Sequence, residues 1–277
     1  MDSTLQHVVS QGAKELFSLS VRGIEKLRDK YVWTKEEIEE ARAYLVYFRD
    51  VMKEENSELF HTIFGEGDFF DLEPFARGYT SRVLAFRTIV DKSIKRWVIK
   101  VGFRFALIEQ NGDPSQSNYP KEYQIYLDIL RDSVKRYEHL QHLLPEPQAV
   151  TWASLTSEEN KKMETTLAIQ PCMNVVKPSK LRSVLTTEQK KDLLVELTEF
   201  KQLSAYLIEK HKVRPELVGE GNLEIVKKND EYRLMLLDMG WVDLKKILPI
   251  TQTVAHFSAQ YAVGKLENWL RNKWSFF

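Results

Sequence analysis

Hydrophobic residues near the start of the chain recur every three or four positions, the spacing of one face of an α-helix. Residues 3–30 show this spacing in a mixed form. The next segment predicts a helix more clearly, because Thr34 and Glu37 have the spacing of a capping box. The apolar stripe of that helix comprises Ile38, Ala41, Leu45, Phe48 and Met52. A shorter helix is expected near residues 58–64, so residues 1–68 are predicted to form a helical extension.

From about Phe69 the pattern changes to short apolar runs separated by polar turns, which is typical of β-strands. The strand-like runs are residues 75–86, which begin with a turn, and then residues 96–101, 148–154 and 165–170. Between the second and third runs, an apolar face predicts a helix over residues 120–136. Residues 171–174 follow the last of these strands and form a candidate hinge.

The last third of the chain predicts two helices and one β-hairpin. A long helix is expected over residues 187–210. Its buried stripe comprises Leu193, Leu194, Leu197, Phe200, Leu203 and Leu207. The hairpin consists of apolar runs at residues 223–226 and 234–237 around a polar turn. A final helix is expected over residues 251–274.

The predicted hairpin brings two oxygen-bearing side chains to the same edge of a sheet. Asn222 comes just before its first strand, and Asp238 comes just after its second. Amide and carboxylate oxygens are hard ligands, and Mg²⁺ binds a few of these together with phosphate oxygens and water. The hairpin therefore predicts a magnesium site with Asn222 and Asp238 as ligands.

Two further charged residues stand among apolar neighbours. Lys100 lies inside the apolar run 96–101, where a lysine either reaches a strand edge or meets an anionic partner. Glu122 lies near the start of the apolar face of the next predicted helix and is a candidate partner for Lys100. The alternative for Glu122 is an exposed first-turn carboxylate that the helix dipole favours.

Composition narrows the classes of function. The chain has 277 residues, enough for one large or two small domains around a sizeable core. Its 40 basic and 40 acidic residues give a formal net charge of zero, which argues against broad electrostatic binding of nucleic acid. Cys172 is the only cysteine, so neither an intramolecular disulfide nor a cysteine-based zinc site is available. The chain shows neither a signal-peptide core nor an apolar run long enough to span a bilayer, so we expect a cytoplasmic protein without a membrane partner.

The order of these features resembles the protein-kinase-like superfamily, including its aminoglycoside-phosphotransferase and atypical small-kinase branches. The shared order is a strand lysine, a helix glutamate, a hinge, a long helix, an asparagine and an aspartate, over roughly Phe69 to Asp243. The segment 98–100, Val-Ile-Lys, is similar to the V-A-I-K strand of that family.

The resemblance implies an α+β, bilobal protein-kinase-like fold. Residues 69–170 would form an N-lobe with an antiparallel sheet, preceded by the helical N-terminal extension. Residues 171–277 would form a compact, truncated helical C-lobe that carries the metal-binding hairpin.

The resemblance also implies roles for individual residues around ATP and Mg²⁺. Lys100 would hold the nucleotide phosphates, and Glu122 would pair with Lys100. Asn222 and Asp238 match the two Mg²⁺ ligands of the family.

The remaining nucleotide contacts would come from the hinge and from a reduced glycine-rich loop. Under the resemblance the hinge that meets the adenine ring would be residues 168–173, which include Gln170 and Cys172. Of the glycine-rich loop only Gly78 is present, with Thr80 and Ser81 close behind it, so fewer backbone amides are available for phosphate.

The catalytic loop departs from the family pattern. In H-R-D-x-x-x-x-N an aspartate stands five residues before the asparagine, and that position is Leu217 here. Glu216 would replace this aspartate if the loop carries a one-residue insertion. Misplacing a catalytic base by about 1 Å costs on the order of 100-fold in rate. The short segment after Asp238 also lacks room for the C-lobe of an ordinary protein kinase.

Three functions are consistent with these patterns. The first is a phosphotransferase that moves the γ-phosphate of ATP to a hydroxyl of an unknown protein or small-molecule acceptor, with Glu216 as catalytic base. The second is a pseudokinase, a nucleotide-binding or ligand-free scaffold that acts through protein partners. The third is an α+β interaction protein without a ligand. The displaced catalytic residue favours nucleotide binding over phosphate transfer.

Overall fold

A computed structural model defines the helices and strands of most of the chain. The described residues are 33–77, 81–102, 119–156, 162–176, 178–215, 217, 222–237, 240–245 and 249–271. The helices are α2 (Lys35–Glu55), α3 (Ser57–Phe64), α5 (Tyr119–Val134), η2 (Glu138–Leu140, a 3₁₀ turn), α6 (Pro178–Val184), α7 (Thr187–His211) and α8 (Pro249–Leu270). The strands are β1 (Phe69–Arg77), β2 (Ser81–Val90), β3 (Ser93–Gly102), β4 (Ala149–Thr156), β5 (Lys162–Pro171), β6 (Val213–Pro215), β7 (Leu223–Lys228), β8 (Glu231–Leu236) and β9 (Trp241–Asp243).

The described residues divide into two compact units. The sheet unit contains the described residues from Trp33 to Ile125 together with Glu146–Cys172. The helical unit contains Tyr126–Pro145 and the described residues from Met173 onward.

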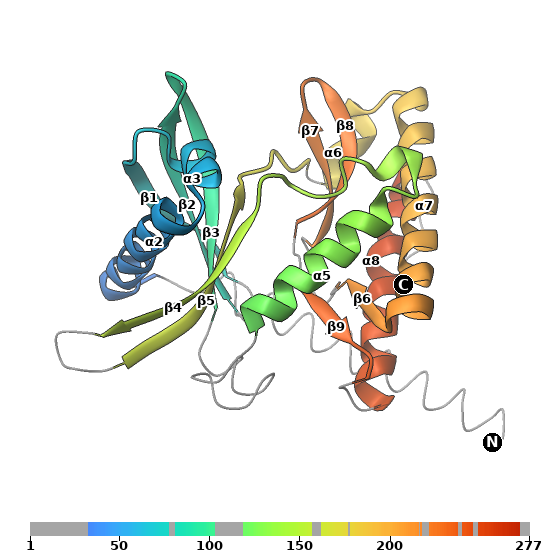
Figure 1. Cartoon of the computed structure of the whole chain (residues 1–277). Coiled ribbons are helices and arrows are strands. Elements are labelled where there is room, and N and C mark those ends of the chain that lie inside the picture. Colours follow the sequence, from blue (N-terminus) through green and yellow to red (C-terminus); the bar gives the residue numbers. More distant parts are fainter. Residues whose placement is uncertain are drawn as a thin grey trace. The chain divides into compact units, whose positions relative to one another are not determined.

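Strands β1 to β5 form one antiparallel sheet in the order β1-β2-β3-β5-β4 (Figure 1). The central strand β3 pairs with β2 on one side and with β5 on the other. Helix α5 follows β3 in the chain and precedes β4, so it separates the strands of the sheet into two groups in sequence. The predicted α+β class and antiparallel sheet are confirmed.

Helices α2 and α3 pack on one face of this sheet and share a hydrophobic core with it (Figure 1). The predicted capping box of α2 is confirmed, because the Glu37 N–H donates to Thr34 Oγ1 and the Thr34 N–H donates to Glu37 Oε2, both at 3.2 Å. The strand residues in the core include Leu84, Phe86, Trp97, Ile99, Val101, Leu167 and Ile169. They alternate along each strand, as expected when one face of a sheet is covered by helices.

Polar contacts and one glycine fix the position of α3 on the sheet. The Thr88 hydroxyl donates to the Ile63 carbonyl at 2.7 Å and accepts from the Trp97 indole N–H at 2.8 Å. Gly65, which follows α3, has φ +59°, and a Cβ there would lie 2.1 Å from the Ile89 carbonyl oxygen. A side chain at Gly65 would therefore both strain the backbone and clash with β2.

In the helical unit, the long helix α7 buries one of its faces. Its buried residues are Leu193, Glu196, Leu197, Phe200, Leu203 and Leu207. Leu194 was expected in this stripe but is only half-buried. The helix begins at Thr187, as predicted, and Thr186 is its N-cap: Thr186 and Gln189 form a capping box, with hydrogen bonds of 3.2 and 2.9 Å.

Short strands complete the helical unit. β6 pairs with β9, and β7 pairs with β8 in the predicted hairpin. The hairpin turn is Asn229-Asp230, with φ of 50° and 65°, as a two-residue type I′ turn requires. The β2–β3 turn, Asp91-Lys92, has similar positive φ values of 49° and 62°, so β3 begins at Ser93, three residues before the predicted run.

Within the described ranges, no helix combines the length and the apolar character needed to cross a membrane.

Replacement of Ile99 by alanine tests the core of the sheet unit. Ile99 has no exposed surface, so Ile99→Ala is expected to lower the free energy of unfolding by about 2–5 kcal/mol. Ile94 lies in the same strand but is 65% exposed, so Ile94→Ala is expected to change it by about 0.5 kcal/mol or less. Urea denaturation followed by circular dichroism measures both values, and equal losses would contradict the described core.

Candidate functional site

Lys100 lies on β3, on the face of the sheet that α2 and α3 do not cover. Its neighbours in the strand, Ile99 and Val101, are buried in the core, so the Lys100 side chain leaves from the opposite face. Lys100 pairs with Val83 in β2 and with Ala168 in β5. The side chain is half-buried, which fits the predicted lysine within an apolar strand.

The two predicted hinge residues lie at the end of the neighbouring strand. Gln170 pairs with Val98, which is two residues before Lys100, so Gln170 and Lys100 belong to the same face of the sheet. Gln170 is buried. The Cys172 N–H donates to the Arg96 carbonyl at 2.9 Å, which continues the pairing of β5 with β3. Burial raises the pKa of the half-buried Cys172 thiol, so this cysteine is poorly suited to be a nucleophile.

Glu122 and Ser81 also belong to the sheet unit. Glu122 lies in the first turn of α5 and is half-buried. The predicted pair of Glu122 with Lys100 stays a prediction. Ser81 begins β2, where it pairs with Gly102 at the end of β3.

Asn222 lies at the open end of the β7–β8 hairpin, as predicted. It directly precedes β7, and its carbonyl accepts a hydrogen bond from the Leu237 N–H at 2.7 Å. Leu237 follows β8 and is the residue before Asp238. The two ends of the hairpin that lead to the predicted metal ligands are therefore hydrogen-bonded to each other.

Four of the predicted site residues lie outside the described residues: Gly78, Thr80, Glu216 and Asp238. The roles predicted for them stay predictions. Among the residues that are described, no three histidine, cysteine, aspartate or glutamate side chains converge as a metal site would need. The predicted magnesium site is of a different kind, since it needs one amide, one carboxylate and phosphate oxygens.

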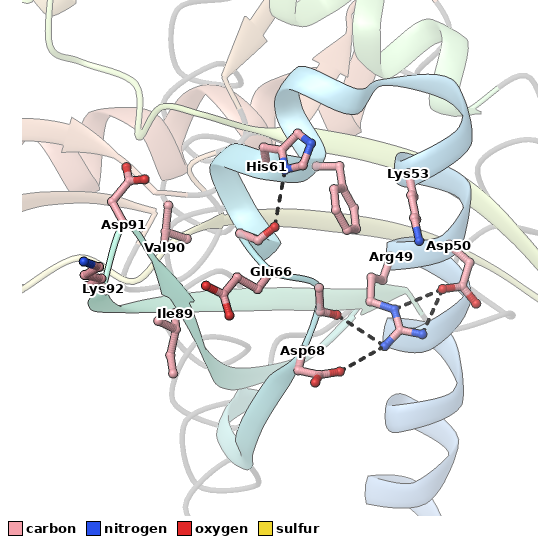
Figure 2. Close-up of a pocket in the computed structure, with 13 residues that line it drawn as sticks. Arg49, Asp50, Lys53, His61, Glu66, Asp68, Ile89, Val90, Asp91 and Lys92 are labelled. Atoms are coloured by element: carbon pink, nitrogen blue, oxygen red, sulfur yellow. Dashed lines mark hydrogen bonds and ion pairs between the residues drawn. The ribbon is translucent and has the colours of Figure 1, made fainter.

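A hollow of about 960 Å³ lies elsewhere in the sheet unit, where α2, the turn after α3 and the β2–β3 turn meet (Figure 2). Its lining carries both signs of charge. The Arg49 side chain is held within it by Asp50 at 2.9 Å, by the Gly67 carbonyl at 3.4 Å and by Asp68 at 3.9 Å. None of the residues predicted to bind nucleotide is among the residues that line it. Arg49 is already paired with Asp50 and Asp68, so this arginine has little attraction left for an anionic ligand.

The helical unit contains a buried carboxylate that the sequence pattern did not single out. Glu196 of α7 is 1% exposed. It accepts hydrogen bonds from the Leu234 N–H at 2.7 Å and from Arg233 Nη1 at 3.0 Å, and it contacts His142 Nε2 at 3.2 Å. These donors come from β8 and from the segment after η2, so one carboxylate ties three parts of the unit together.

A second carboxylate, one turn further along α7, holds the η2 turn. Glu199 accepts from the His139 N–H at 2.9 Å and from His139 Nδ1 at 2.8 Å. The hydrogen bond with Glu199 raises the pKa of the His139 imidazole, because it favours the protonated ring. His139 and His142 thus contact two acidic residues of one helix, Glu199 and Glu196.

Comparison with known proteins gives no family by which to assign these residues. No family model matches the sequence, and no curated protein matches it. The function must therefore be inferred from the chain itself.

The buried carboxylate of Glu196 gives a direct test of the helical unit. Glu196→Gln is expected to lower the free energy of unfolding by about 1.5–3 kcal/mol, because hydrogen bonds to a buried charged group are lost. Glu188 lies on the same helix in an exposed pair with Lys191, so Glu188→Gln is expected to change stability by less than about 1 kcal/mol. Chemical denaturation of both variants measures the difference, and similar values for the two would contradict a structural role for Glu196.

Proposed function

We propose that the protein binds Mg²⁺-ATP in the manner of the protein-kinase-like superfamily. The observation that carries the proposal is the order of the elements along the chain. A β1-β2-β3-β5-β4 sheet with the lysine on β3 is followed by a helix with a glutamate in its first turn. The boundary between the two units lies after Cys172, and the long helix α7 and the β7–β8 hairpin follow it. In the sequence, Asn222 precedes the hairpin and Asp238 follows it.

Lys100 is proposed to hold the nucleotide phosphates. Its half-buried position supports this, because a lysine whose stem is packed among apolar residues loses little freedom when it binds an anion. Gln170, on the same face of the sheet, and Cys172, which follows β5, are the proposed contacts for the adenine ring. Glu122 is proposed to orient the Lys100 ammonium group.

Asn222 and Asp238 are proposed to hold the Mg²⁺ ion that accompanies the nucleotide phosphates. The hydrogen bond between Asn222 and Leu237 supports this, because it keeps the residue before Asp238 next to Asn222. Two protein oxygens are a typical protein share of a Mg²⁺ site, where phosphate and water supply the remaining ligands.

A pseudokinase is the second candidate function, and one observation favours it. Leu217 occupies the position where the family has its catalytic aspartate, and this leucine is buried. An apolar buried side chain cannot accept a proton or orient an acceptor hydroxyl. Transfer of phosphate to a hydroxyl acceptor therefore requires Glu216 as the base.

Thermal unfolding with and without Mg²⁺-ATP tests nucleotide binding. ATP at one hundred times its dissociation constant is expected to stabilise the wild type by about 2.7 kcal/mol. Lys100→Ala and Asp238→Ala are expected to lose most of this effect. Lys95 is exposed on the same strand as Lys100, so Lys95→Ala is the matched control and is expected to keep it. A wild type that ATP does not stabilise would contradict nucleotide binding and would leave a ligand-free scaffold or interaction protein.

A transfer assay separates the phosphotransferase from the pseudokinase. Release of the γ-phosphate of ATP is measured with a panel of hydroxyl compounds, which includes sugars and hydroxyl-bearing peptides. If the protein is a phosphotransferase, Glu216→Gln is expected to lower the rate by about 100-fold or more while the ATP-dependent thermal shift remains. Nucleotide binding without turnover in the wild type would identify the pseudokinase.

A further inference from the structure

Strand β4 forms one edge of the antiparallel sheet and differs from the strand at the opposite edge, β1 (Figure 1). Strand β1 has the features that keep edge strands from pairing with other chains. It contains Pro74, which has no N–H, its register with β2 shifts twice, and Asp71 has a positive φ of 52°. Strand β4 contains no proline and pairs with β5 along its whole length without a register shift. The outer edge of β4 is therefore regular enough to pair with another strand.

The hydrogen-bond pattern of the sheet determines which backbone groups of β4 face its outer edge. The Cys172 N–H donates to the Arg96 carbonyl, so the backbone groups of Cys172, and of every second residue before it in β5, are directed toward β3. The residues between them are directed toward β4, where Leu167 pairs with Thr151. The alternate residues of β4 therefore direct their N–H and C=O groups away from β5, namely Val150, Trp152, Ser154 and Thr156. Within the described ranges, no other strand pairs with these groups.

The sequence of β4 favours a second copy of the same strand as the partner. No residue of β4 is charged, whereas each of the other described strands contains at least one charged residue. Like charges that lie opposite each other destabilise a pair of strands, so two copies of β4 can pair without such repulsion in any register. A strand of another sequence would gain no ion pair from β4. In an antiparallel pair of identical strands, related by a twofold axis, the outward N–H and C=O groups of each copy bond to the same groups of the other.

We infer that β4 is a dimerisation strand, which pairs antiparallel with β4 of a second copy of this chain and joins the two sheets into one. The contact consists mainly of backbone hydrogen bonds, so the dimer is expected to be reversible. The inference goes beyond the proposed nucleotide binding, because β4 contains none of the residues assigned to the nucleotide or to Mg²⁺.

Sedimentation velocity over a range of protein concentrations tests this contact, and the wild type is expected to form dimers as the concentration rises. Ser154→Pro removes one outward N–H from each copy and leaves the hydrogen bonds with β5 in place, which an edge strand tolerates. The dissociation constant of the dimer is expected to rise by about 10- to 100-fold, because two hydrogen bonds are lost across the twofold axis. Ile94→Ala is the control: it removes an exposed apolar side chain of the same sheet and is expected to dimerise as the wild type does.

Amide hydrogen exchange of the wild type, followed by nuclear magnetic resonance, gives a second readout that does not depend on how a variant folds. The N–H groups of Thr151 and Ala153 are directed toward β5 and are expected to be protected at low and at high protein concentration. Those of Val150 and Ser154 are expected to exchange fast in the dilute protein and slowly in the concentrated protein.

Three results would overturn the inference. The first is a wild type that stays monomeric, which would leave the edge to a strand of another protein. The second is a Ser154→Pro variant that dimerises as tightly as the wild type, which would place the contact on another surface. The third is protection of the outward N–H groups in the dilute protein, which would show that the chain itself covers this edge.

Discussion

The sheet unit depends on the register of its central strand, β3. Ile99 lies opposite Leu84 of β2 and Ile169 of β5, and all three side chains are buried under α2 and α3. Because side chains alternate along a strand, burial of Ile99 sends Lys100 to the other face of the sheet. A slip of one residue would exchange the two, so the packing of apolar neighbours fixes the lysine more firmly than any single polar contact. The position of the proposed phosphate-binding residue is thus a consequence of core packing.

The elements that the sequence predicts correctly are those whose signal is local. The capping box of α2, the stripe of α7 and the runs of the β7–β8 hairpin all lie within about two dozen consecutive residues. The predicted strand boundary was wrong where exposed residues of a strand resemble a turn in the sequence. Lys95 belongs to β3 but is exposed, and its charge made this end of the strand look like part of the preceding turn. A charged residue in the sequence indicates solvent exposure, and the residues at an exposed strand end are as accessible to solvent as those of a turn.

The candidate site shows the same division between local and distant signals. Lys100 could be predicted because a lysine is unusual within an apolar strand, and Asn222 because it adjoins a recognisable hairpin. Glu196 could not be predicted, since its partners are 37 to 54 residues away in the chain and a glutamate on a helix is usually exposed. Only the fold brings Arg233 and His142 to it. The same is true of Arg214 and His256, which are 42 residues apart.

Glu196 and Arg214 are both buried charged residues, but they differ in the partners that the fold gives them. The carboxylate of Glu196 accepts from a backbone N–H and from a guanidinium group, so its charge is satisfied within the fold and its role is structural. Arg214 is equally removed from water, but its only described hydrogen-bond partner is a neutral ring nitrogen. For Glu196 the fold itself explains the burial, because loss of the carboxylate would leave the buried Leu234 N–H without an acceptor.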